Sequence, residues 1–322
     1  MLGISIIIPC KNEEKYISRC IDSLLLQEGV SLDREIVVVD NGSTDNTLNI
    51  LETYGSSITY YICPGLSIAG LRNFGVEKST KEWIAFVDAD VEVDKHWAKA
   101  FNGFLEGLNA KGMDRKRIIT GSTCMVPENP SWVEQTWYEQ LMLRDTDAAK
   151  YINSGNLIIH REMMEHLGGF DTSYKTGEEE KLCEDARMEH SGIILKNASM
   201  KAVHHGYPKT LGVFFQRMRW HGKGMSKYLL KPWKSKPLLL AIYYLFLTAV
   251  YMYSLLVSHR YYSLSMLYLL LQITPAFLYA SRRYRRIGKT TLLLTFLYVC
   301  FGWARATSIF DMVLHREVFQ KK

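Results

Sequence analysis

Three acidic residues stand at every second position after a short apolar run. Asp88, Asp90 and Glu92 follow Trp83–Val87, a run of strand length that ends abruptly in charge. Side chains two residues apart lie on the same face of an extended chain. If the extended conformation continues, the three carboxylates point the same way. So much negative charge in one place needs a positively charged partner.

The elements around this acidic cluster alternate between two patterns. Runs of β-branched and aromatic residues with strand length alternate with segments that carry apolar residues at helical spacing. The strand-like runs are Ile4–Ile8, Glu35–Val39 and Trp83–Val87, and the helix-like segments are Glu13–Leu26, Thr44–Thr53 and Ser67–Lys78. This alternation predicts an α/β fold with a mostly parallel sheet. Ligands of such sheets bind at the carboxyl ends of the strands, where this chain places its polar clusters.

Charge divides the 322-residue chain into two parts. From His190 onward there are 20 basic residues and only two acidic ones, and no Asp or Glu occurs between His190 and Phe310. Two apolar runs in this part, Leu238–Val257 and Ser263–Ser281, contain 20 and 19 residues without a charge. A helix needs about 20 apolar residues to cross a bilayer. The pattern therefore predicts a soluble head joined to a membrane part.

Basic residues flank these runs and indicate their orientation. They are Lys227, Lys231, Lys234 and Lys236 before the first run, and Arg282, Arg283, Arg285, Arg286 and Lys289 after the second. The positive-inside rule places both groups, and the head, on the cytoplasmic side. A third run, Thr290–Ala304, has 15 residues and is followed by Arg305, so it is either a further span or a helix partly in the interface. A full third span would export Arg316, Lys321 and Lys322, which the rule disfavours.

Other features narrow the class of protein. No signal-peptide pattern precedes the strand-like start, and the six cysteines show no C-x-x-C spacing, which favours free thiols over disulfides or a zinc site. The basic residues of the second part flank apolar spans, so we expect them to face lipid and not nucleic acid.

Four motifs in register carry a resemblance to a known family. They are SIIIPCKNEEKYISRCIDSLL, EIVVVDNGSTDNT, GLSIAGLRNFGVEKSTKEWIAFVDADVEV and NSGNLIIHREMMEHLGGFD. The chain resembles the family 2 glycosyltransferases of the GT-A fold over roughly its first 225 residues. The resemblance implies a GT-A domain over residues 1–208 and an interfacial region over 209–236. The apolar runs predict two to three transmembrane helices over 237–311, followed by a tail over 312–322.

The resemblance assigns a metal and a nucleotide sugar to the edge where the strands end. Asp88 and Asp90 match the D-x-D motif that holds metal and donor, with Glu92 and His205 as further candidate ligands. Mg²⁺ or Mn²⁺ is the implied cofactor, because a divalent cation stabilises the departing diphosphate and prefers carboxylate oxygens. The candidate contacts to a UDP- or GDP-linked sugar are Pro9, Asn12, Glu13, Asp40, Arg72 and Asp88. Glu13 could equally be an acidic residue in the first turn of a helix, where the helix dipole favours negative charge. His204 and His205 could equally have structural roles. Asn41 occupies the position where the family usually has a second Asp.

The catalytic base has two candidate positions. An inverting transferase needs a carboxylate that takes the proton of the acceptor hydroxyl. After Gly168–Asp171 the family carries an E-D pair, and this chain offers Glu178-Glu179 and Glu184-Asp185. The first pair keeps the spacing and the second keeps the dipeptide. We therefore predict Asp185 with Glu184 as the site of the base, and Glu179 as the alternative.

The acceptor side is predicted from two further segments. Asn156 matches the loop next to the acceptor, and Gln216, Arg219 and Trp220 match a Q-x-x-R-W pattern near the acceptor and diphosphate. A plain membrane anchor is the competing interpretation of the second segment, because its aromatic and basic residues are interleaved as in an interfacial helix.

These features predict a membrane-bound, multi-pass enzyme with its catalytic domain in the cytoplasm. We expect an inverting, metal-dependent hexosyltransferase that acts on a lipid or polyprenyl-linked acceptor in cell-wall, polysaccharide or glycolipid synthesis. The alternatives are a processive polysaccharide synthase, a nucleotidyltransferase and a non-catalytic binding scaffold. The predicted spans are too few to enclose a polymer channel, which argues against a processive synthase. The chain lacks the Gly-rich phosphate loop that is usual in nucleotidyltransferases. The presence of the acidic residues of the D-x-D motif argues against a non-catalytic scaffold.

Overall fold

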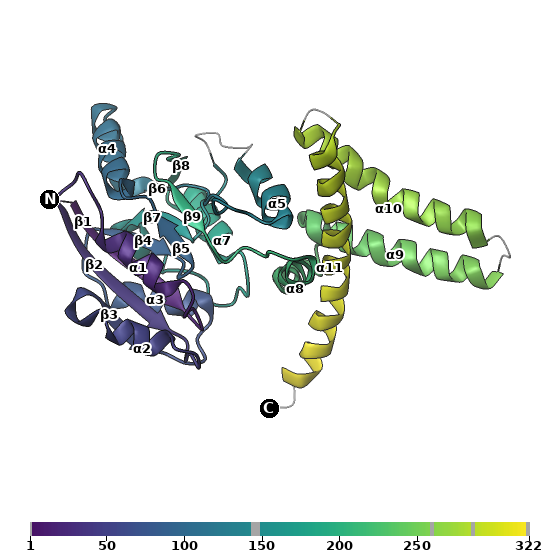
Figure 1. The fold of residues 1–322 in the computed structure, drawn as a ribbon, viewed down its shortest axis with the longest axis horizontal. Helices are drawn as coiled ribbons and strands as arrows, with labels where there is room; N and C mark the ends of the chain where they lie inside the picture. Colours follow the sequence, from purple (N-terminus) through teal and green to yellow (C-terminus); the bar gives the residue numbers. More distant parts are fainter. Residues whose placement is uncertain (1, 143–148, 258–260, 285–286, 320–322) are drawn as a thin grey trace. The chain divides into compact units, whose positions relative to one another are not determined.

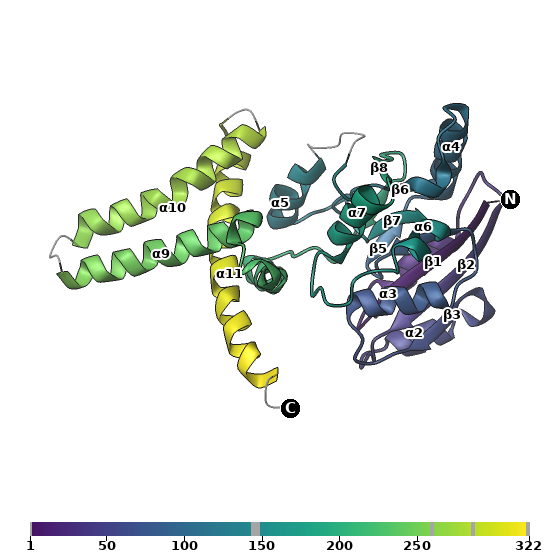
Figure 2. The same cartoon turned by 180° about the vertical axis from the view of Figure 1, so that it is seen from behind.

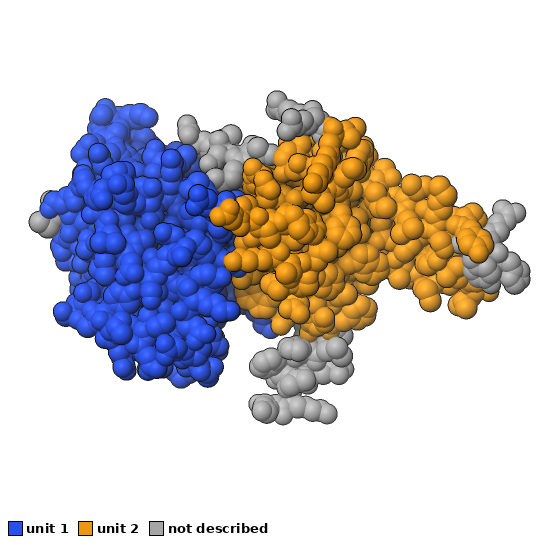
Figure 3. Space-filling view, in the orientation of Figure 1, with its two compact units in different colours: residues 1–128, 144–207 blue, residues 129–143, 208–322 orange. Residues whose placement is uncertain are grey.

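The computed structural model describes residues 2–142, 149–257, 261–284 and 287–319. The chain forms two compact units, shown in different colours in Figure 3. We call residues 1–128 with 144–207 the head unit, and residues 129–143 with 208–322 the helical unit. Arg285, Arg286, Lys321 and Lys322, which entered the orientation argument, lie outside the described residues.

The head unit is built on a seven-stranded sheet with the order β3-β2-β1-β4-β7-β6-β8. Strands β1 to β4 run parallel, whereas β7 pairs antiparallel with both β4 and β6. The strands of this sheet are β1 (Leu2–Cys10), β2 (Leu32–Asp40), β3 (Thr59–Ile62), β4 (Trp83–Val87), β6 (Ile118–Gly121), β7 (Asn156–His160) and β8 (Ile193–Lys196). A second, two-stranded sheet pairs β5 (Val91–Val93) with β9 (Ala202–His204).

Helices cover both faces of the large sheet (Figures 1 and 2). Alternate residues of one strand enter different layers, so that Ile6 packs with α1 and α4 while Ile7 packs with α3, α6 and α7. The helices of the head unit are α1 (Ile17–Leu25), α2 (Thr47–Glu52), α3 (Ile68–Glu77), α4 (Trp97–Ala110), α6 (Arg161–His166) and α7 (Glu178–Glu189), with 3₁₀ turns η1 (Gly55–Ser57) and η2 (Arg115–Arg117).

The three strands and three helices predicted from the sequence are all present. The strand Trp83–Val87 has the predicted bounds, while α1 begins at Ile17 and not at Glu13. The segment between Glu13 and Ile17 forms a turn. Its carbonyl oxygen Glu13 O accepts hydrogen bonds from the backbone N–H groups of Tyr16 and Ile17, both at 2.9 Å. The mostly parallel α/β architecture is confirmed.

The helical unit contains α5 (Trp132–Met142) and the whole C-terminal part of the chain. The latter consists of α8 (Leu211–Gly222), η3 (Lys223–Tyr228), η4 (Pro232–Lys234), α9 (Lys236–Val257), α10 (Tyr261–Tyr284) and α11 (Lys289–Phe319). Buried Val133 of α5 packs with Phe214 of α8 and with Leu297 and Ala304 of α11. Residues 129–143, which the sequence placed in the catalytic domain, therefore belong to this unit.

Three helices of this unit are long and apolar enough to cross a membrane, namely Lys236–Val257, Tyr262–Tyr284 and Lys289–Met312. Helices α9 and α10 form a hairpin, and α11 runs across its base (Figure 1). Side-chain contacts agree with this crossing, because Trp303 of α11 donates to Gln272 of α10 at 2.8 Å and packs edge-on against Tyr244 of α9.

Candidate active site

The acidic cluster lies where β4 leaves the large sheet. All five residues of β4 are buried, and the strand lies between β1 and β7 in the sheet. The chain turns directly after it, since Val91 N donates to Asp88 O at 3.0 Å. The extended conformation therefore does not continue through Asp90. For this reason Glu92 does not join the two aspartates, although its spacing in the sequence would have placed it there.

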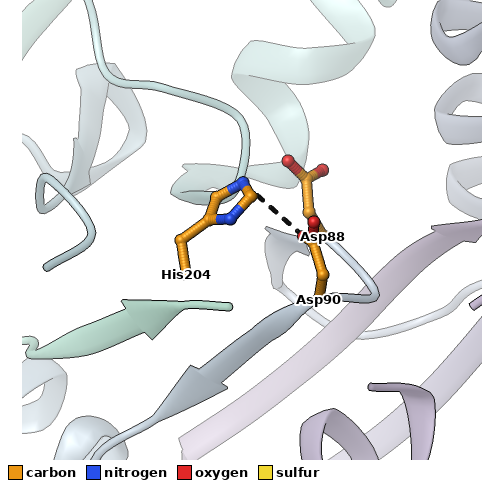
Figure 4. A group of neighbouring side chains, drawn as sticks. All are labelled: Asp88, Asp90 and His204. Carbon is orange, nitrogen blue, oxygen red and sulfur yellow. Dashed lines mark ion pairs between the residues drawn. The ribbon is translucent and has the colours of Figure 1, made fainter. Parts of the chain in front are cut away.

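The structure brings His204 to the two aspartates. In the small sheet, Val91 of β5 pairs with His204 of β9, which places the ring beside the residue before Val91. His204 Nε2 lies 3.6 Å from Asp90 Oδ1, drawn as a dashed line in Figure 4. One ligand atom each from Asp88, Asp90 and His204 lies within 4.8 Å of the others. Two carboxylates and an imidazole form a donor set that could hold a divalent metal ion.

Glu92 and His205 form a neighbouring pair outside this group. His205 Nε2 lies 2.7 Å from Glu92 Oε2, and Arg19 Nη1 lies 3.6 Å from the same oxygen. The His205 ring also stacks near Tyr16. Of the two adjacent histidines, the sequence favoured His205 as the ligand, whereas the geometry favours His204. Strand pairing decides this, and a single sequence does not reveal the register of β5 and β9.

The absence of a side chain at Gly206 leaves room for the carboxylate of Asp90. A side chain at this position would place its Cβ 1.8 Å from Asp90 Oδ2, an impossible contact. The backbone next to it also holds the aspartate, because His205 N donates to Asp90 O at 2.8 Å. Gly206 was not singled out from the sequence, although a glycine two residues after His204 is the visible signal.

Arg72 joins Asp88 to α7. Its side chain is 3% exposed, and its two terminal nitrogens bond two different carboxylates, Asp88 Oδ1 at 2.8 Å and Glu178 Oε1 at 2.6 Å. The guanidinium also lies 5.6 Å from the centre of the Phe170 ring. Arg72 was predicted to contact the donor. In this structure it has two protein partners, a double ion pair that its planar fork suits, and the donor contact stays a prediction.

The two candidate positions of the base are far apart on α7. Glu179 lies in the first turn, whereas Asp185 lies six residues later, about 9 Å further along the helix axis. Asp185 forms an ion pair with Lys181 on the same helix. Burial and the neighbouring Glu178 carboxylate raise the pKa of Glu179 to about 7, and the Asp88 charge adds to this effect. Glu184 is exposed.

The predicted nucleotide residues lie at the ends of β1 and β2. Asp40 is fully buried, and its carboxylate accepts hydrogen bonds from both the backbone N–H and the hydroxyl of Ser43. Asn12 has a positive φ of 55° and accepts from Thr44 N at 2.8 Å, which ties the loop after β1 to the loop after β2. Pro9 lies opposite Val39 in the sheet.

Glu13 and Asn41 complete this edge. Glu13 N donates to Thr47 Oγ1 at 2.8 Å. Asn41 accepts from Gly65 N at 2.7 Å and donates to Leu66 O at 3.0 Å, so it fastens the loop after β3. This explains how an amide serves where the family usually has a carboxylate, because only the amide can donate to the Leu66 carbonyl.

The side chain of Asn156 forms hydrogen bonds in the interior of the protein. The residue is 0% exposed, its Oδ1 accepts from Trp97 Nε1 at 2.8 Å, and its Nδ2 donates to Ser122 Oγ and Met200 O. The predicted acceptor contact is therefore not available to its side chain in this structure. The loop before it does reach the acidic cluster, because a Cβ at Gly155 would lie 3.0 Å from Asp88 Oδ2.

The Q-x-x-R-W residues lie in the helical unit, on α8. Arg219 forms a two-bond ion pair with Asp311 of α11, with Nε–Oδ2 at 2.8 Å and Nη2–Oδ1 at 2.5 Å. Trp220 is 47% exposed, and Gln216 is exposed. The partner Asp311 was not foreseen, because it lies 92 residues away in the sequence.

Comparison with known proteins defines the family. Residues 5–168, half of the chain, match the family described as Glycosyl transferase family 2. The chain therefore belongs to glycosyl transferase family 2, as its motifs predicted. It is 37% identical over 97 residues to the lipopolysaccharide core biosynthesis glycosyltransferase LpsC of Rhizobium meliloti, covering 29% of this chain and 34% of that protein.

A second relative is the poly(ribitol-phosphate) β-N-acetylglucosaminyltransferase TarS of Staphylococcus aureus. It is 33% identical over 110 residues, which covers 33% of this chain and 19% of TarS. The matched segments are therefore about a fifth to a third of the length of these relatives.

Solved structures align with most of this chain. The mannosyltransferase PcManGT from Pyrobaculum calidifontis, in complex with GDP-Man and Mn²⁺, aligns with a TM-score of 0.61 and 18% identity, covering 94% of this chain and 86% of its own. Residues 1–349 of S. aureus TarS align with a TM-score of 0.50 and 16% identity, covering 98% and 92%. The head unit therefore has the GT-A fold.

Proposed function

We propose that this protein is an inverting, metal-dependent glycosyltransferase. It moves a sugar from a nucleotide diphosphate to a lipid or lipid-linked acceptor at the cytoplasmic face of a membrane. The observation that carries the proposal is the group of Asp88, Asp90 and His204 at the carboxyl edge of the sheet, joined through Arg72 to the first turn of α7. Family membership supports a nucleotide-sugar donor.

Asp88, Asp90 and His204 are the residues that would hold the cation. A bound Mn²⁺ or Mg²⁺ supplies positive charge that stabilises the departing diphosphate. The imidazole favours Mn²⁺, since Mg²⁺ is usually held by oxygen ligands. Two solved structures of similar fold agree with this preference, since GalNAc-T7 was solved with UDP, GalNAc and Mn²⁺ and PcManGT with GDP-Man and Mn²⁺.

Glu179 is the base that we propose. A general base works best when its pKa lies near the working pH, and the pKa of Glu179 is raised to about 7. Asp185 has a neutralising Lys181 partner and lies six residues further along the helix. Glu179 takes the proton from the acceptor hydroxyl as that oxygen bonds to the anomeric carbon. The bond from this carbon to the donor phosphate breaks on the opposite face, which inverts the configuration.

The helical unit supports a membrane-held acceptor. We propose that only the α9–α10 hairpin crosses the bilayer, while α11 lies along the membrane surface across the base of the hairpin. This arrangement keeps the basic segments before α9 and after α10 on one side, as the positive-inside rule requires. It also leaves the C-terminal tail with the head. A single hairpin has no room for a polymer channel, which favours a lipid-linked acceptor over processive synthesis.

Incubation of membranes that contain the protein with a panel of labelled nucleotide sugars tests the proposal. We expect one label to enter the lipid extract in the presence of Mn²⁺ and to stay out of it in the Asp90→Asn variant. Label that enters only long water-soluble polymer would favour the processive alternative. Release of pyrophosphate from a nucleoside triphosphate would favour a nucleotidyltransferase.

A further inference from the structure

The ring of His204 lies face to face with the ring of Tyr207. The two ring centres are 4.1 Å apart, and the ring planes are within 7° of parallel. His204 is the last residue of β9, and Tyr207 follows shortly after the end of that strand. The stacking therefore fixes the plane of an imidazole whose Nε2 lies 3.6 Å from Asp90 Oδ1.

One neighbouring segment anchors both rings. The backbone N–H of His204 donates to Met125 O at 3.0 Å, and the hydroxyl of Tyr207 donates to Cys124 O at 3.2 Å. Cys124 is buried, so the carbonyl that holds the hydroxyl belongs to a packed part of the head unit. The phenol ring cannot slide off the imidazole without breaking its own hydrogen bond.

A hydrogen bond at the edge of the imidazole is weaker support for metal binding than the stack on its face. Gly206 N donates to His204 Nδ1 at 3.2 Å. In a neutral imidazole one nitrogen accepts and the other carries the proton, so here the proton is at Nε2. A histidine that binds a cation through one nitrogen carries its proton on the other. A cation at Nε2 is therefore incompatible with the bond from Gly206, whereas the stack with Tyr207 is compatible with either position of the proton.

We infer that Tyr207 is a positioning residue that holds the ring of His204 in place for the cation. The inference rests on the proposed function, because it takes Asp88, Asp90 and His204 as the cation ligands. A ligand that is already held by packing and by outer hydrogen bonds binds a metal with less loss of side-chain freedom. Tyr207 itself contacts the ligand and not the cation.

Titration calorimetry of the full chain with MnCl₂, in the presence of UDP or GDP, tests the inference. Tyr207→Leu removes the aromatic face and should weaken Mn²⁺ binding at least about tenfold, the usual cost of losing an outer partner of a metal ligand. Tyr207→Phe keeps the face and loses only the bond to Cys124 O, so its loss should be clearly smaller. An unchanged dissociation constant in Tyr207→Leu would overturn the inference.

The neighbouring histidine provides a matched control. The ring of His205 stacks near Tyr16, with ring centres 6.1 Å apart, but His205 pairs with Glu92 outside the proposed metal group. Tyr16→Leu should therefore bind Mn²⁺ like the unaltered protein. An equal loss in Tyr16→Leu and Tyr207→Leu would indicate a general effect of removing an aromatic ring near the acidic edge, and it would overturn the inference.

Two further measurements separate positioning of His204 from general damage to the fold. Mg²⁺ is usually held by oxygen ligands, so Tyr207→Leu should lose less affinity for Mg²⁺ than for Mn²⁺. Both ions are titrated into the same sample, which makes the ratio independent of any unfolded fraction. In a His204→Gln background, Tyr207→Leu should cause little additional loss of Mn²⁺ binding, because its effect passes through the missing ring. Equal losses for both ions, or a full additional loss in the double variant, would overturn the inference.

The same titrations distinguish this inference from the proposed function. If the unaltered protein binds no Mn²⁺ with either nucleotide, the metal-dependent function and the role of Tyr207 are both rejected. If Mn²⁺ binding is lost in His204→Gln but unchanged in Tyr207→Leu, the proposed metal site stands and the role of Tyr207 alone is rejected.

Discussion

Arg72 Nη2 lies 2.8 Å from Asp88 Oδ1, inside a head unit where the arginine is almost fully buried. The same guanidinium bonds Glu178 at 2.6 Å, so it stands between two carboxylates of different elements. One comes from the edge of the sheet and the other from the first turn of α7. The pairing positions Asp88, and it holds the start of the helix that carries Glu179.

Removal of this arginine should therefore weaken both folding and activity. In Arg72→Ala the two carboxylates lose their shared counter-charge, and the free energy of unfolding should fall by about 3–5 kcal/mol, as for other broken buried pairs. Arg72→Lys should lose less stability, because one ammonium retains the charge. Chemical denaturation followed by tryptophan fluorescence measures the change. The exposed pair of Lys78 and Glu77 is the control, and Lys78→Ala should leave the midpoint unchanged.

Metal binding should depend on His204 and not on His205. His204→Gln and Asp90→Asn should weaken Mn²⁺ binding at least about tenfold, since even the loss of outer partners costs this much. His205→Gln and Glu92→Gln should bind nearly as well as the unaltered protein. Titration calorimetry with MnCl₂ in the presence of UDP or GDP gives the dissociation constants. The opposite ranking of the two histidines would restore the assignment made from the sequence.

The two candidate bases should differ in turnover and in pH dependence. Glu179→Gln should lower kcat by about 10²–10⁴-fold, the usual contribution of a general base, and Asp185→Asn should change it little. The base must be deprotonated, so kcat/KM should rise with pH up to an inflection at about 7. A cation at Asp88 moves this inflection downward. A full rate in Glu179→Gln would reject the assignment.

Stability is affected in the opposite sense by the same carboxyl. Because the pKa of Glu179 is raised in the folded state, the folded protein binds more protons than the unfolded chain between the ordinary carboxyl value and about 7. Stability should therefore fall as pH rises through this window, and Glu179→Gln should remove this part of the dependence. Denaturant midpoints at pH 5 and pH 8 compare the two proteins.

Asn156 should prove to be a structural residue. Its three hydrogen bonds join β7 to Trp97, Ser122 and Met200 in the interior. Asn156→Ala leaves these groups unpaired and should cost about 1–3 kcal/mol of stability for each group that stays unsatisfied. At a temperature where the variant is folded, its KM for the acceptor should not change. A raised acceptor KM with unchanged stability would support the acceptor role predicted from the sequence.

The end of the chain should lie on the same side of the membrane as the head. If α11 lies across the base of the hairpin, a tag placed after Lys322 is digested by protease only when the cytoplasmic face is open. A tag protected in that preparation and digested from the other side would mean that α11 spans the bilayer. A tag placed before Met1 reports the position of the head in the same vesicles.

Much of the fold of the head unit could be predicted from the sequence, because the patterns that indicate its strands and helices are local in the sequence. Buried strands such as Trp83–Val87 are continuous apolar runs, and the acidic residues that follow them mark the ligand-binding edge of the sheet. The D-x-D pair needed no tertiary information. The double ion pair of Arg72 did, because Glu178 lies 106 residues away in the chain.

Local sequence patterns could not decide between candidate residues that lie close together in the chain. His204 is the last residue of β9 and His205 lies in the turn that follows, and the sequence alone does not show where this strand ends. The family spacing offered Glu178-Glu179 and the dipeptide offered Glu184-Asp185, and only the position along α7 separates them. The membership of α5 in the helical unit was also hidden, since α5 lies in the sequence between two strands of the head unit, β6 and β7.

The placement of α5 means that the polypeptide passes between the two units three times, near residues 128, 143 and 207. A soluble fragment that stops at Tyr207 would still contain α5 but would lack Phe214, Leu297 and Ala304, against which Val133 packs. Such a truncated protein would expose the apolar surface of α5 to solvent and tend to aggregate. Replacing residues 129–143 with a short hydrophilic linker should yield better-behaved material for crystallisation.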